Sequence, residues 1–194
     1  MTHMRFLSIA LTAFVAVGCN RSNTASNGSV GTTGNTDRTE VKAADTAFVN
    51  DLVIANMAEV ELGKLAVERG ANTEVKKFGQ MMIDDHTKAG DKLKSVASAQ
   101  KIPVPTDLDD KHRDLRDKLA KLSGSAFDRD YVAAMVEGHE GVADKLEPRV
   151  DSAKLAAKSD NVVTMAVNEW AAEAYPVVQK HLEAAKALDK ALKP

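Results

Sequence analysis

Apolar residues recur at steps of three and four along four long stretches of the chain, the spacing that places them on one face of an α-helix. In the first stretch, Phe48, Leu52, Ala55 and Leu62 share such a face. Polar and charged residues fill the other positions, as expected of helices that bury one side only. The sequence therefore predicts four long amphipathic helices, at about residues 45–69, 73–100, 126–150 and 160–188.

Capping and helix-breaking residues indicate where these helices begin and end. Thr73 is the expected N-cap of the second helix, and Ser125 with Asp128 resembles a capping box at the start of the third. Pro148 and Pro176 fall inside the third and fourth patterns. Each is expected to kink or split its helix, because proline removes one helical hydrogen bond.

A shorter, highly charged helix is predicted between the second and third long ones, from Asp107 to about Leu122. The connections after the first and third long helices are short, which implies that the helices they join are antiparallel neighbours. We therefore expect an all-α fold. Residues 41–194 should form an antiparallel four-helix bundle, with the short helix lying against it.

The composition agrees with a helical domain plus appendages. Of the 194 residues, 44% are hydrophobic and 28% charged, whereas only 4% are aromatic and alanine is abundant. Alanine is the best helix former, and the shortage of aromatic and β-branched runs argues against a large sheet. The net charge is −2 and bases alternate with acids, so no basic stripe is available to bind nucleic acid.

The first 18 residues have the organisation of an export signal. A short basic start is followed by an apolar run from Phe6 to Val17, which is too short to span a bilayer. Small residues then precede Cys19, the single cysteine, as in the lipobox of a bacterial lipoprotein. We expect cleavage after residue 18 and lipidation of Cys19. The alternative is ordinary secretion with a cysteine of no special role.

Residues 20–40 are rich in serine, asparagine, threonine and glycine and nearly lack apolar side chains. Such a segment cannot bury surface, so we expect residues 19–40 to form a disordered tether that begins at the lipidated cysteine. The chain would then be exported and held at the periplasmic face of a membrane. Asn20, rather than aspartate, follows the cysteine, which favours the outer membrane.

Each long helix carries one polar residue on its apolar face: Glu59, His86, His139 and His181. At roughly 1.5 Å per residue, His139 and His181 are expected within about 3 Å of each other in depth along the bundle. Glu59 and His86 could lie in the same layer or miss it. Leaving a buried polar group unpaired costs roughly 1–3 kcal/mol, so all four should find partners.

Three interpretations of this layer remain open. The first is a structural hydrogen-bond network of neutral histidines with Glu59, joined by Tyr131, Asp85 or water. The second is a metal site between facing helices, because imidazole and carboxylate groups are common ligands in helical bundles. The third is proton sensing by histidines with a pKa near 6.5.

Two segments repeat one pattern and add a variant of the metal site. Residues 78–93 and 131–146 share an aromatic residue, a methionine, a histidine and Asp-Lys-Leu in the same register. Met82 and Met135 each lie four residues before the histidine of their segment, so each pair shares a helix face. Thioether with imidazole suits copper, whereas core filler is the usual role of a buried methionine.

Four motifs, in order along the chain, resemble a known family. They are Asn56–Ala66, Met82–His86, Phe127–His139 and Tyr175–Leu182. Together they resemble the family called domain of unknown function 4142, often described as a predicted outer-membrane protein. The resemblance implies a ferritin-like helical bundle exported to the cell envelope, and it implies no catalytic residues.

No familiar catalytic motif is recognised in the sequence. A nucleophile elbow, a phosphate loop and H-E-x-x-H are absent. Ile83, Val136 and Val178 stand where the Glu-x-x-His motif of di-iron bundles requires glutamate. The sequence favours a cell-envelope lipoprotein whose non-enzymatic bundle has a binding, structural or stress role. The alternative is a periplasmic metal-binding protein for copper, zinc or iron. The expected partner is the membrane, through the lipid anchor, and no protein partner is indicated.

Overall fold

The computed structural model describes residues 38–155 and 160–193, with the side chains of 152–155 excepted. These residues contain no β-strand and form five helices: α1 (Ala43–Arg69), α2 (Thr73–Ala99), α3 (Asp110–Leu119), α4 (Gly124–Leu155) and α5 (Val162–Leu192). The all-α class predicted from the apolar spacing is therefore confirmed. The expected signal peptide, Cys19 and tether residues 20–37 lie outside the described residues.

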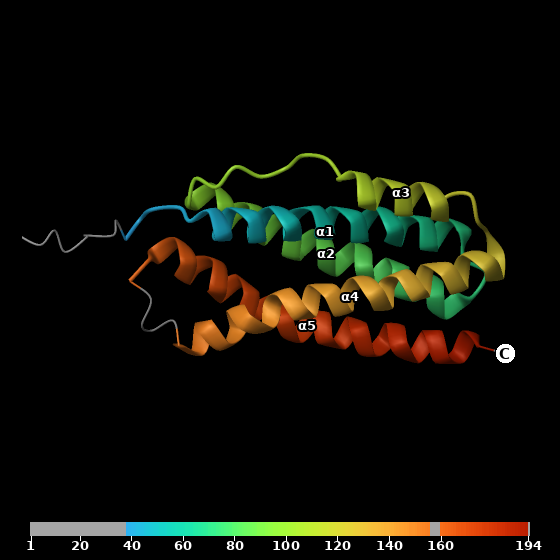
Figure 1. Ribbon diagram of the computed structural model, residues 1–194. Helices are drawn as coiled ribbons and strands as arrows, with labels where there is room; N and C mark the ends of the chain where they lie inside the picture. The colour runs from blue at the N-terminus through green and yellow to red at the C-terminus, as the bar shows by residue number, and fades with distance from the viewer. Residues whose placement is uncertain (1–37, 156–159, 194) are drawn as a thin grey trace, which may run out of the picture. The chain divides into compact units, whose positions relative to one another are not determined.

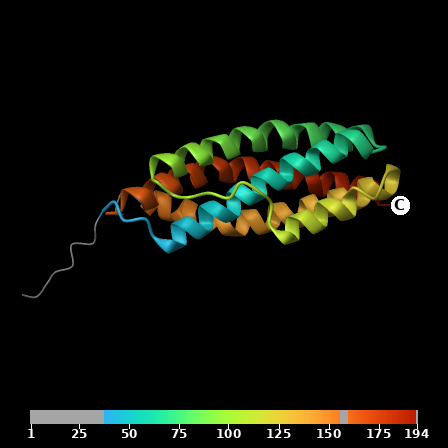
Figure 2. The same ribbon diagram turned by 90° about the horizontal axis from the view of Figure 1, so that it is seen from above.

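Two helix pairs account for most of the packing (Figure 1). α1 packs along α2 and α4 along α5, while smaller interfaces join α2 to α5 and α1 to α4. Both views show α1 and α5 running in one direction and α2 and α4 in the opposite one (Figures 1 and 2). The helices of each pair, which short connections join, are therefore antiparallel.

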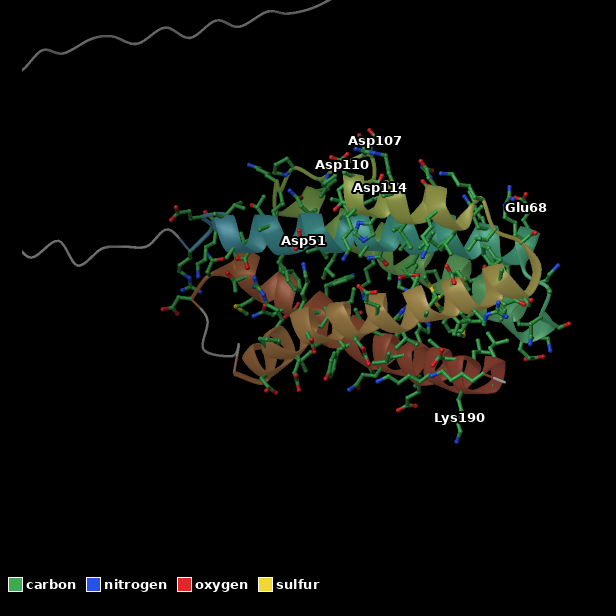
Figure 3. The ribbon with its side chains drawn as sticks, turned by 45° about the vertical axis from the view of Figure 1, so that its right-hand side comes forward. Asp51, Glu68, Asp107, Asp110, Asp114 and Lys190 are labelled. Atoms are coloured by element: carbon green, nitrogen blue, oxygen red, sulfur yellow. The ribbon has the colours of Figure 1, made fainter. Side chains whose placement is uncertain are left out.

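The short helix α3 lies against α1 and also touches α4. Its contacts include the fully buried side chain of Leu119 and an ion pair in which Nη1 of Arg116 lies 3.1 Å from Oε2 of Glu61 on α1. Asp110 and Asp114 extend from the outer side of α3 in Figure 3. α3 thus adds one apolar anchor and one cross-helix ion pair to the outside of α1.

The close packing of α1 on α2 depends on glycine. A Cβ atom at Gly63 would lie 2.6 Å from the carbonyl oxygen of Gly79, and one at Gly79 would lie 2.7 Å from the Cβ atom of Ala66. Farther along α2, a Cβ atom at Gly90 would lie 3.3 Å from that of Asn56. These glycines bring the middle of α1 close enough to α2 for polar side chains of the two helices to meet.

The N-cap of α2 lies one residue earlier than the sequence pattern predicts. Asn72, not Thr73, is the cap, because its side-chain oxygen accepts a hydrogen bond from the backbone N–H of Glu74 at 2.8 Å. In the same way, Asn161 caps α5 by accepting from the backbone N–H of Thr164 at 2.9 Å. Asparagine ranks with the best N-cap residues, above threonine, which accounts for the shift at α2.

The expected capping box at the start of α4 is not formed. α4 already begins at Gly124, so Ser125 lies inside the helix rather than before it. The carboxylate of Asp128 instead accepts hydrogen bonds from the backbone N–H groups of Ala71 and Asn72, at 3.1 and 2.9 Å. Asp128 therefore ties α4 to the turn between α1 and α2, a contact across 57 residues that no local pattern indicates.

Neither internal proline splits its helix. α4 continues through Pro148, and α5 continues through Pro176. Both prolines are exposed, so the carbonyl group that loses its helical partner can be satisfied by water. The prediction that a proline splits its helix is therefore wrong at both positions.

Two apolar clusters fill the interior. The first gathers the N-terminal halves of α1 and α5 and the C-terminal halves of α2 and α4, with Leu52, Leu93, Leu146 and Trp170 among its members. The second gathers the opposite halves, with Leu62, Phe78, Tyr131 and Ala185 among its members. On every long helix a short gap separates the two clusters, and this gap contains Glu59, His86, His139 and His181.

The chain just before α1 contacts the start of α5. The carbonyl oxygen of Arg38 accepts a hydrogen bond from the backbone N–H of Val162 at 2.9 Å. The carbonyl oxygen of Glu40 accepts one from Nδ2 of Asn161, also at 2.9 Å. The end of the segment that the sequence assigns to the tether is thus joined to α5.

The outer faces of the helices are polar. Figure 3 shows Lys190 extending outward from α5 and Glu68 lying near the end of α1. Exposed ion pairs such as that of Lys145 with Asp51 connect neighbouring helices at the surface. None of the described helices has a stretch that is both long enough and apolar enough to cross a bilayer.

Candidate metal centre

The polar residues of the four long helices meet in one layer between the two apolar clusters. α1 contributes Glu59, α2 His86, α4 His139 and α5 His181, and all four line one cavity. In all three pairs of histidines the ring centroids are 5.3–5.5 Å apart. His139 and His181 are 2% and 3% exposed. The predicted common depth of His139 and His181 is confirmed, and His86 joins them.

The three histidines form a group that can hold a metal ion. Each ring offers one nitrogen such that the three atoms lie within 4.8 Å of one another. Glu59 is not a member of this trio, although its Oε1 lies 3.9 Å from Nδ1 of His139. Its carboxyl group therefore stands beside the three imidazoles rather than among them.

Hydrogen bonds determine which nitrogen of His86 and of His139 carries the proton. Asn56 donates through Nδ2 to the carbonyl oxygen of Leu52 at 2.7 Å, so its Oδ1 accepts from Nδ1 of His86 at 3.1 Å. The carbonyl oxygen of Met135 can only accept, so Nδ1 of His139, 2.8 Å away, is the donor. In each neutral ring the other nitrogen, Nε2, then keeps its lone pair.

His181 is held in the same way through its opposite nitrogen. Its Nε2 donates to Oδ2 of Asp85 at 3.1 Å, which leaves the lone pair on Nδ1. Nε2 of His86, Nε2 of His139 and Nδ1 of His181 are buried and have no hydrogen-bond partner among the described residues. Three acceptors cannot satisfy one another, so this layer needs a cation or a proton donor.

Burial keeps the imidazoles neutral. Desolvation lowers the pKa of His139 from 6.5 to about 4, and it lowers the pKa of His86 well below 6.5, with the charges of the other two histidines acting in the same direction. Desolvation also lowers the pKa of His181, while the hydrogen bond to Asp85 opposes the shift. Neutral imidazole is the form that binds metals. The pKa of each folded ring is lowered, so the proton-sensing interpretation stays a prediction, and its test is a loss of stability in acid.

Glu59 is a buried carboxyl group with an unpaired oxygen. Burial raises its pKa from 4.5 to about 8, so the group is protonated at neutral pH. Among the described residues, neither Oε2 of Glu59 nor the hydroxyl of Tyr131 has a hydrogen-bond partner. Burial raises the pKa of Tyr131 well above 10, and the charge of the nearby Glu59 makes a smaller contribution in the same direction. A cation among the imidazoles would lower the pKa of Glu59 and favour its ionised form.

A cavity of about 300 Å³ adjoins the three imidazoles on the side of the first apolar cluster. Leu52, Leu146 and Trp170 contribute to its apolar walls. The exposed pair of Lys92 and Glu173, which joins α2 to α5, lines its outer part. The same cavity is therefore lined both by the imidazoles and by surface residues of α2 and α5.

Met82 and Met135 are placed differently from the histidines that follow them. Both side chains are buried in the second apolar cluster, and neither lines the cavity beside the imidazoles. Their surroundings are those of methionine that fills space in a core. Of the six residues that the sequence proposes for a metal site, the structure thus joins three imidazoles, with Glu59 adjacent and the two thioethers in the core.

The pattern shared by α2 and α4 has a geometric counterpart. The two helices run in the same direction in Figure 1, and a backbone bridge between Gly70 and Gly124 sets their beginnings side by side. Equivalent residues then contact each other. The ring centroids of Phe78 and Tyr131 are 6.3 Å apart, and those of the two equivalent histidines are 5.5 Å apart. The repeat therefore delivers two imidazoles to one depth from different helices.

Asn56, which orients the ring of His86, was not singled out from the sequence, whereas Asp85 was named as a member of a hydrogen-bond network without a specific partner. Asn56 lies one turn before Glu59 on the buried side of α1, and an uncharged amide at such a position is the signal that could have identified it. Asp85 is adjacent to His86 in sequence but bonds His181 on α5. Successive helical residues point about 100° apart, so neighbours in sequence serve different faces.

The chain was compared with known proteins and protein families. The family model for Domain of unknown function (DUF4142) matches residues 30–188. No curated protein and no solved structure matches the chain. Because the family match covers most of the sequence, the chain belongs to this family, as its four motifs indicate.

Proposed function

We propose that this member of the DUF4142 family binds a divalent transition-metal ion through His86, His139 and His181. Two observations carry the proposal: each of the three imidazoles offers a nitrogen within 4.8 Å of the others, and each has a buried nitrogen without a partner among the described residues. A metal ion accepts three lone pairs at once, which no single side-chain donor does as well. Glu59 stands beside the site and can supply a negative charge by losing its proton.

The surroundings of the rings resemble those of metal-binding histidines. Such histidines usually donate their second N–H to a carboxylate or carbonyl group, which fixes the ring orientation. Asn56, Met135 and Asp85 provide these acceptors here. Zn²⁺ held by three imidazoles needs nitrogens roughly 3.3 Å apart. The three rings, with nitrogens within 4.8 Å, would close by about 1.5 Å or less.

The ligand set favours an ion that prefers nitrogen. Imidazole suits zinc, nickel, iron and copper, whereas thioethers select copper in its reduced state. Met82 and Met135 belong to the second apolar cluster and do not line the cavity, so the ligand set that we propose is imidazole without sulfur. Three imidazoles also leave the fourth position of a tetrahedral ion open. We therefore take Zn²⁺ as the ion of choice, with Co²⁺ as its spectroscopic substitute.

Titration calorimetry with Zn²⁺ tests this function on the purified chain after treatment with a chelator. The expected result is one equivalent bound with a dissociation constant of micromolar or below. A chain that binds no Zn²⁺ at micromolar concentrations would refute the proposal. The layer would then be a purely structural network of neutral histidines with Glu59, which is the competing interpretation.

We further propose that the fold is an antiparallel, ferritin-like four-helix bundle to which α3 is added. Two antiparallel pairs with polar ligands between them support this architecture. An experimental structure in which α2 and α5 do not face each other across the histidines would contradict it.

We also propose that the chain is an exported lipoprotein, held by Cys19 at the periplasmic face of the outer membrane. The support is the order of a basic start, an apolar run and small residues before a single cysteine. Mass spectrometry of the mature N-terminus should find a lipidated residue 19, and Cys19→Ser should leave the membrane fraction. An unmodified peptide that starts at Asn20 or later is the contrary result.

A further inference from the structure

The cavity that adjoins the histidines has two chemically different parts. One end is formed by the three imidazoles and Glu59. Apolar side chains from α1, α4 and α5 form further walls, among them Leu52, Val142, Leu146, Trp170, Ala174 and Val178, and charged residues of α2 and α5 also line the cavity. The volume of about 300 Å³ exceeds what a metal ion occupies and reaches the lower end of the range for small-molecule sites.

The apolar walls are held in place by contacts of their own. Trp170 donates its Nε1–H to the carbonyl oxygen of Ala89 at 3.3 Å, which fixes the indole between α5 and α2. Leu52 and Leu146 are 1% and 0% exposed and belong to the first apolar cluster. A wall that is already ordered binds an apolar tail by shape without a large cost in lost side-chain freedom.

The polar end calls for a negatively charged group once a metal is bound. Three neutral imidazoles leave both positive charges of a divalent ion uncompensated, which is costly in an interior of low dielectric constant. A carboxylate in the open coordination position would offset part of this charge, and carboxylate oxygens are ordinary ligands of Zn²⁺.

The outer part of the cavity offers a positive charge to an entering anion. Lys88 lines it, with a side chain that is 79% exposed, and its Nζ lies 4.0 Å from Oδ1 of Asp85, which also lines the cavity. Lys92 is paired with Glu173 across the seam. A loosely paired lysine at an entrance attracts anions and raises their rate of entry.

We infer that the cavity binds a monocarboxylate with an apolar tail of medium length. The carboxylate occupies the open position of the metal, and the tail lies against Leu146 and Trp170. This inference rests on the proposed metal site, since the metal recognises the head group. The apolar walls recognise the tail independently, so the two contributions can be separated by changing one end of the ligand at a time.

Visible absorption of the Co²⁺-loaded full chain tests the inference directly. Octanoate carries both the head and the tail, acetate carries only the head, and octan-1-ol lacks the anionic head. Octanoate should change the Co²⁺ absorption and bind at least tenfold more tightly than acetate, because its tail buries apolar surface. Octan-1-ol should leave the absorption unchanged.

Two matched substitutions on α5 locate the tail. Ala174 lines the cavity, whereas Ala172 on the same helix is also half-buried but does not line it. Ala174→Leu should weaken octanoate binding at least tenfold and retain Co²⁺ affinity, and Ala172→Leu should change neither. If Ala174→Leu does not fold, Val142→Leu on the opposite wall gives the same test.

The outcomes separate the two proposals. A wild-type chain that binds no Co²⁺ refutes the metal site and this inference together. A chain that binds Co²⁺ but shows no spectral response to octanoate refutes only the inference, as does equal affinity for octanoate and acetate. Equal octanoate affinity in Ala174→Leu and Ala172→Leu would likewise remove the tail from this cavity.

Discussion

Two groups of buried polar side chains lie between the long helices and differ in how completely they are paired. Near the start of α1, Asp45 is 1% exposed and accepts hydrogen bonds from Arg149 at 2.5 Å and from Thr164 at 2.6 Å. Arg149 also donates to Asn168 at 3.2 Å, and its guanidinium carbon lies 4.5 Å from the ring centroid of Phe48. Both oxygens of the Asp45 carboxylate therefore have donors.

The histidine layer is paired only on its outer side. His86, His139 and His181 each direct one N–H to an acceptor and turn an unpaired nitrogen inward, beside the unpaired oxygen of Glu59. Unpaired buried groups cost roughly 1–3 kcal/mol each. A cluster whose hydrogen bonds are all made joins helices, whereas a cluster with ordered but incomplete hydrogen bonding is suited to bind a ligand.

The largest effect is expected from breaking the completed cluster. Asp45→Ala leaves Arg149 largely buried without its partner, so the free energy of unfolding should fall by about 3–5 kcal/mol while Zn²⁺ affinity is retained. Urea denaturation and calorimetry measure the two quantities. Asp51→Ala, which removes the exposed pair with Lys145 on the outer surface, is the control and should cost less than about 1 kcal/mol. Equal losses in both variants would contradict the comparison.

Removing one imidazole should have the opposite effect, with stability retained and Zn²⁺ affinity lost. His139→Leu replaces an incompletely paired ring by an apolar side chain, so the metal-free chain should keep its stability within about 1 kcal/mol. Zn²⁺ affinity should fall at least about a hundredfold, because even residues that merely orient a ligand contribute 10–100-fold. His112→Leu on α3, where the ring pairs with Asp109, should leave Zn²⁺ affinity unchanged. Unaltered affinity in His139→Leu would exclude this ring as a ligand.

The pH dependence of stability in the metal-free chain tests the protonation of the buried Glu59. Between pH 4.5 and 8, Glu59 is protonated in the folded chain and ionised in the unfolded one, so stability is lost as pH rises through this range. From pH 6.5 to 9 the expected loss is about 2 kcal/mol by linkage. Urea unfolding of chelator-treated protein measures it. Glu59→Gln should remove the loss, and a persistent decline in that variant would assign it to other groups.

On the acid side the histidines act with the opposite sign. The pKa of His139 is 6.5 in the unfolded chain and about 4 in the folded one, so the unfolded chain binds more protons between these values. Stability is then lost as pH falls below about 6.5. His139→Leu should make this decline shallower than in the wild type. An identical decline in both proteins would show that His139 does not contribute to it.

The smallest effect is expected from a residue that only orients a ring. Asp85→Asn weakens the acceptor for Nε2 of His181, so Zn²⁺ affinity should fall about tenfold. Asp84→Asn alters the adjacent exposed aspartate, which pairs with Gln80, and should change nothing. Calorimetry of the two variants decides the point, and equal affinities would remove Asp85 from the site.

Much of the fold and part of the site could be predicted because they depend on neighbours along the chain. Helical spacing identified the buried faces of the long helices, and with them the inward positions of His86, His139 and His181. The internal repeat placed two of these rings at equivalent positions. The pattern of Ser125 and Asp128 misled for the same reason, since a local pattern cannot show that the carboxylate bonds a turn 57 residues away.

Which acceptor holds each histidine could not be predicted, although Asp85 was named as a member of the network. Asp85 and His181 are separated by 96 residues, and Asp45 and Arg149 by 104. Whether such pairs meet depends on the distance and rotation between helices, which the apolar spacing of each helix leaves undetermined. The close approach of α1 to α2 at Gly63 is one such determinant, and only the packed structure reveals it.

The all-α class, the family and the inward-facing side chains follow from the sequence alone, because helical periodicity and the order of motifs are properties of the chain in one dimension. The convergence of three rings with Glu59 beside them, the packing of Met82 and Met135 in the core, and the nitrogen that keeps its lone pair in each ring are known only from the packed helices. Those features depend on contacts between helices, and each proton is located by an acceptor that the ring reaches only after the chain has folded.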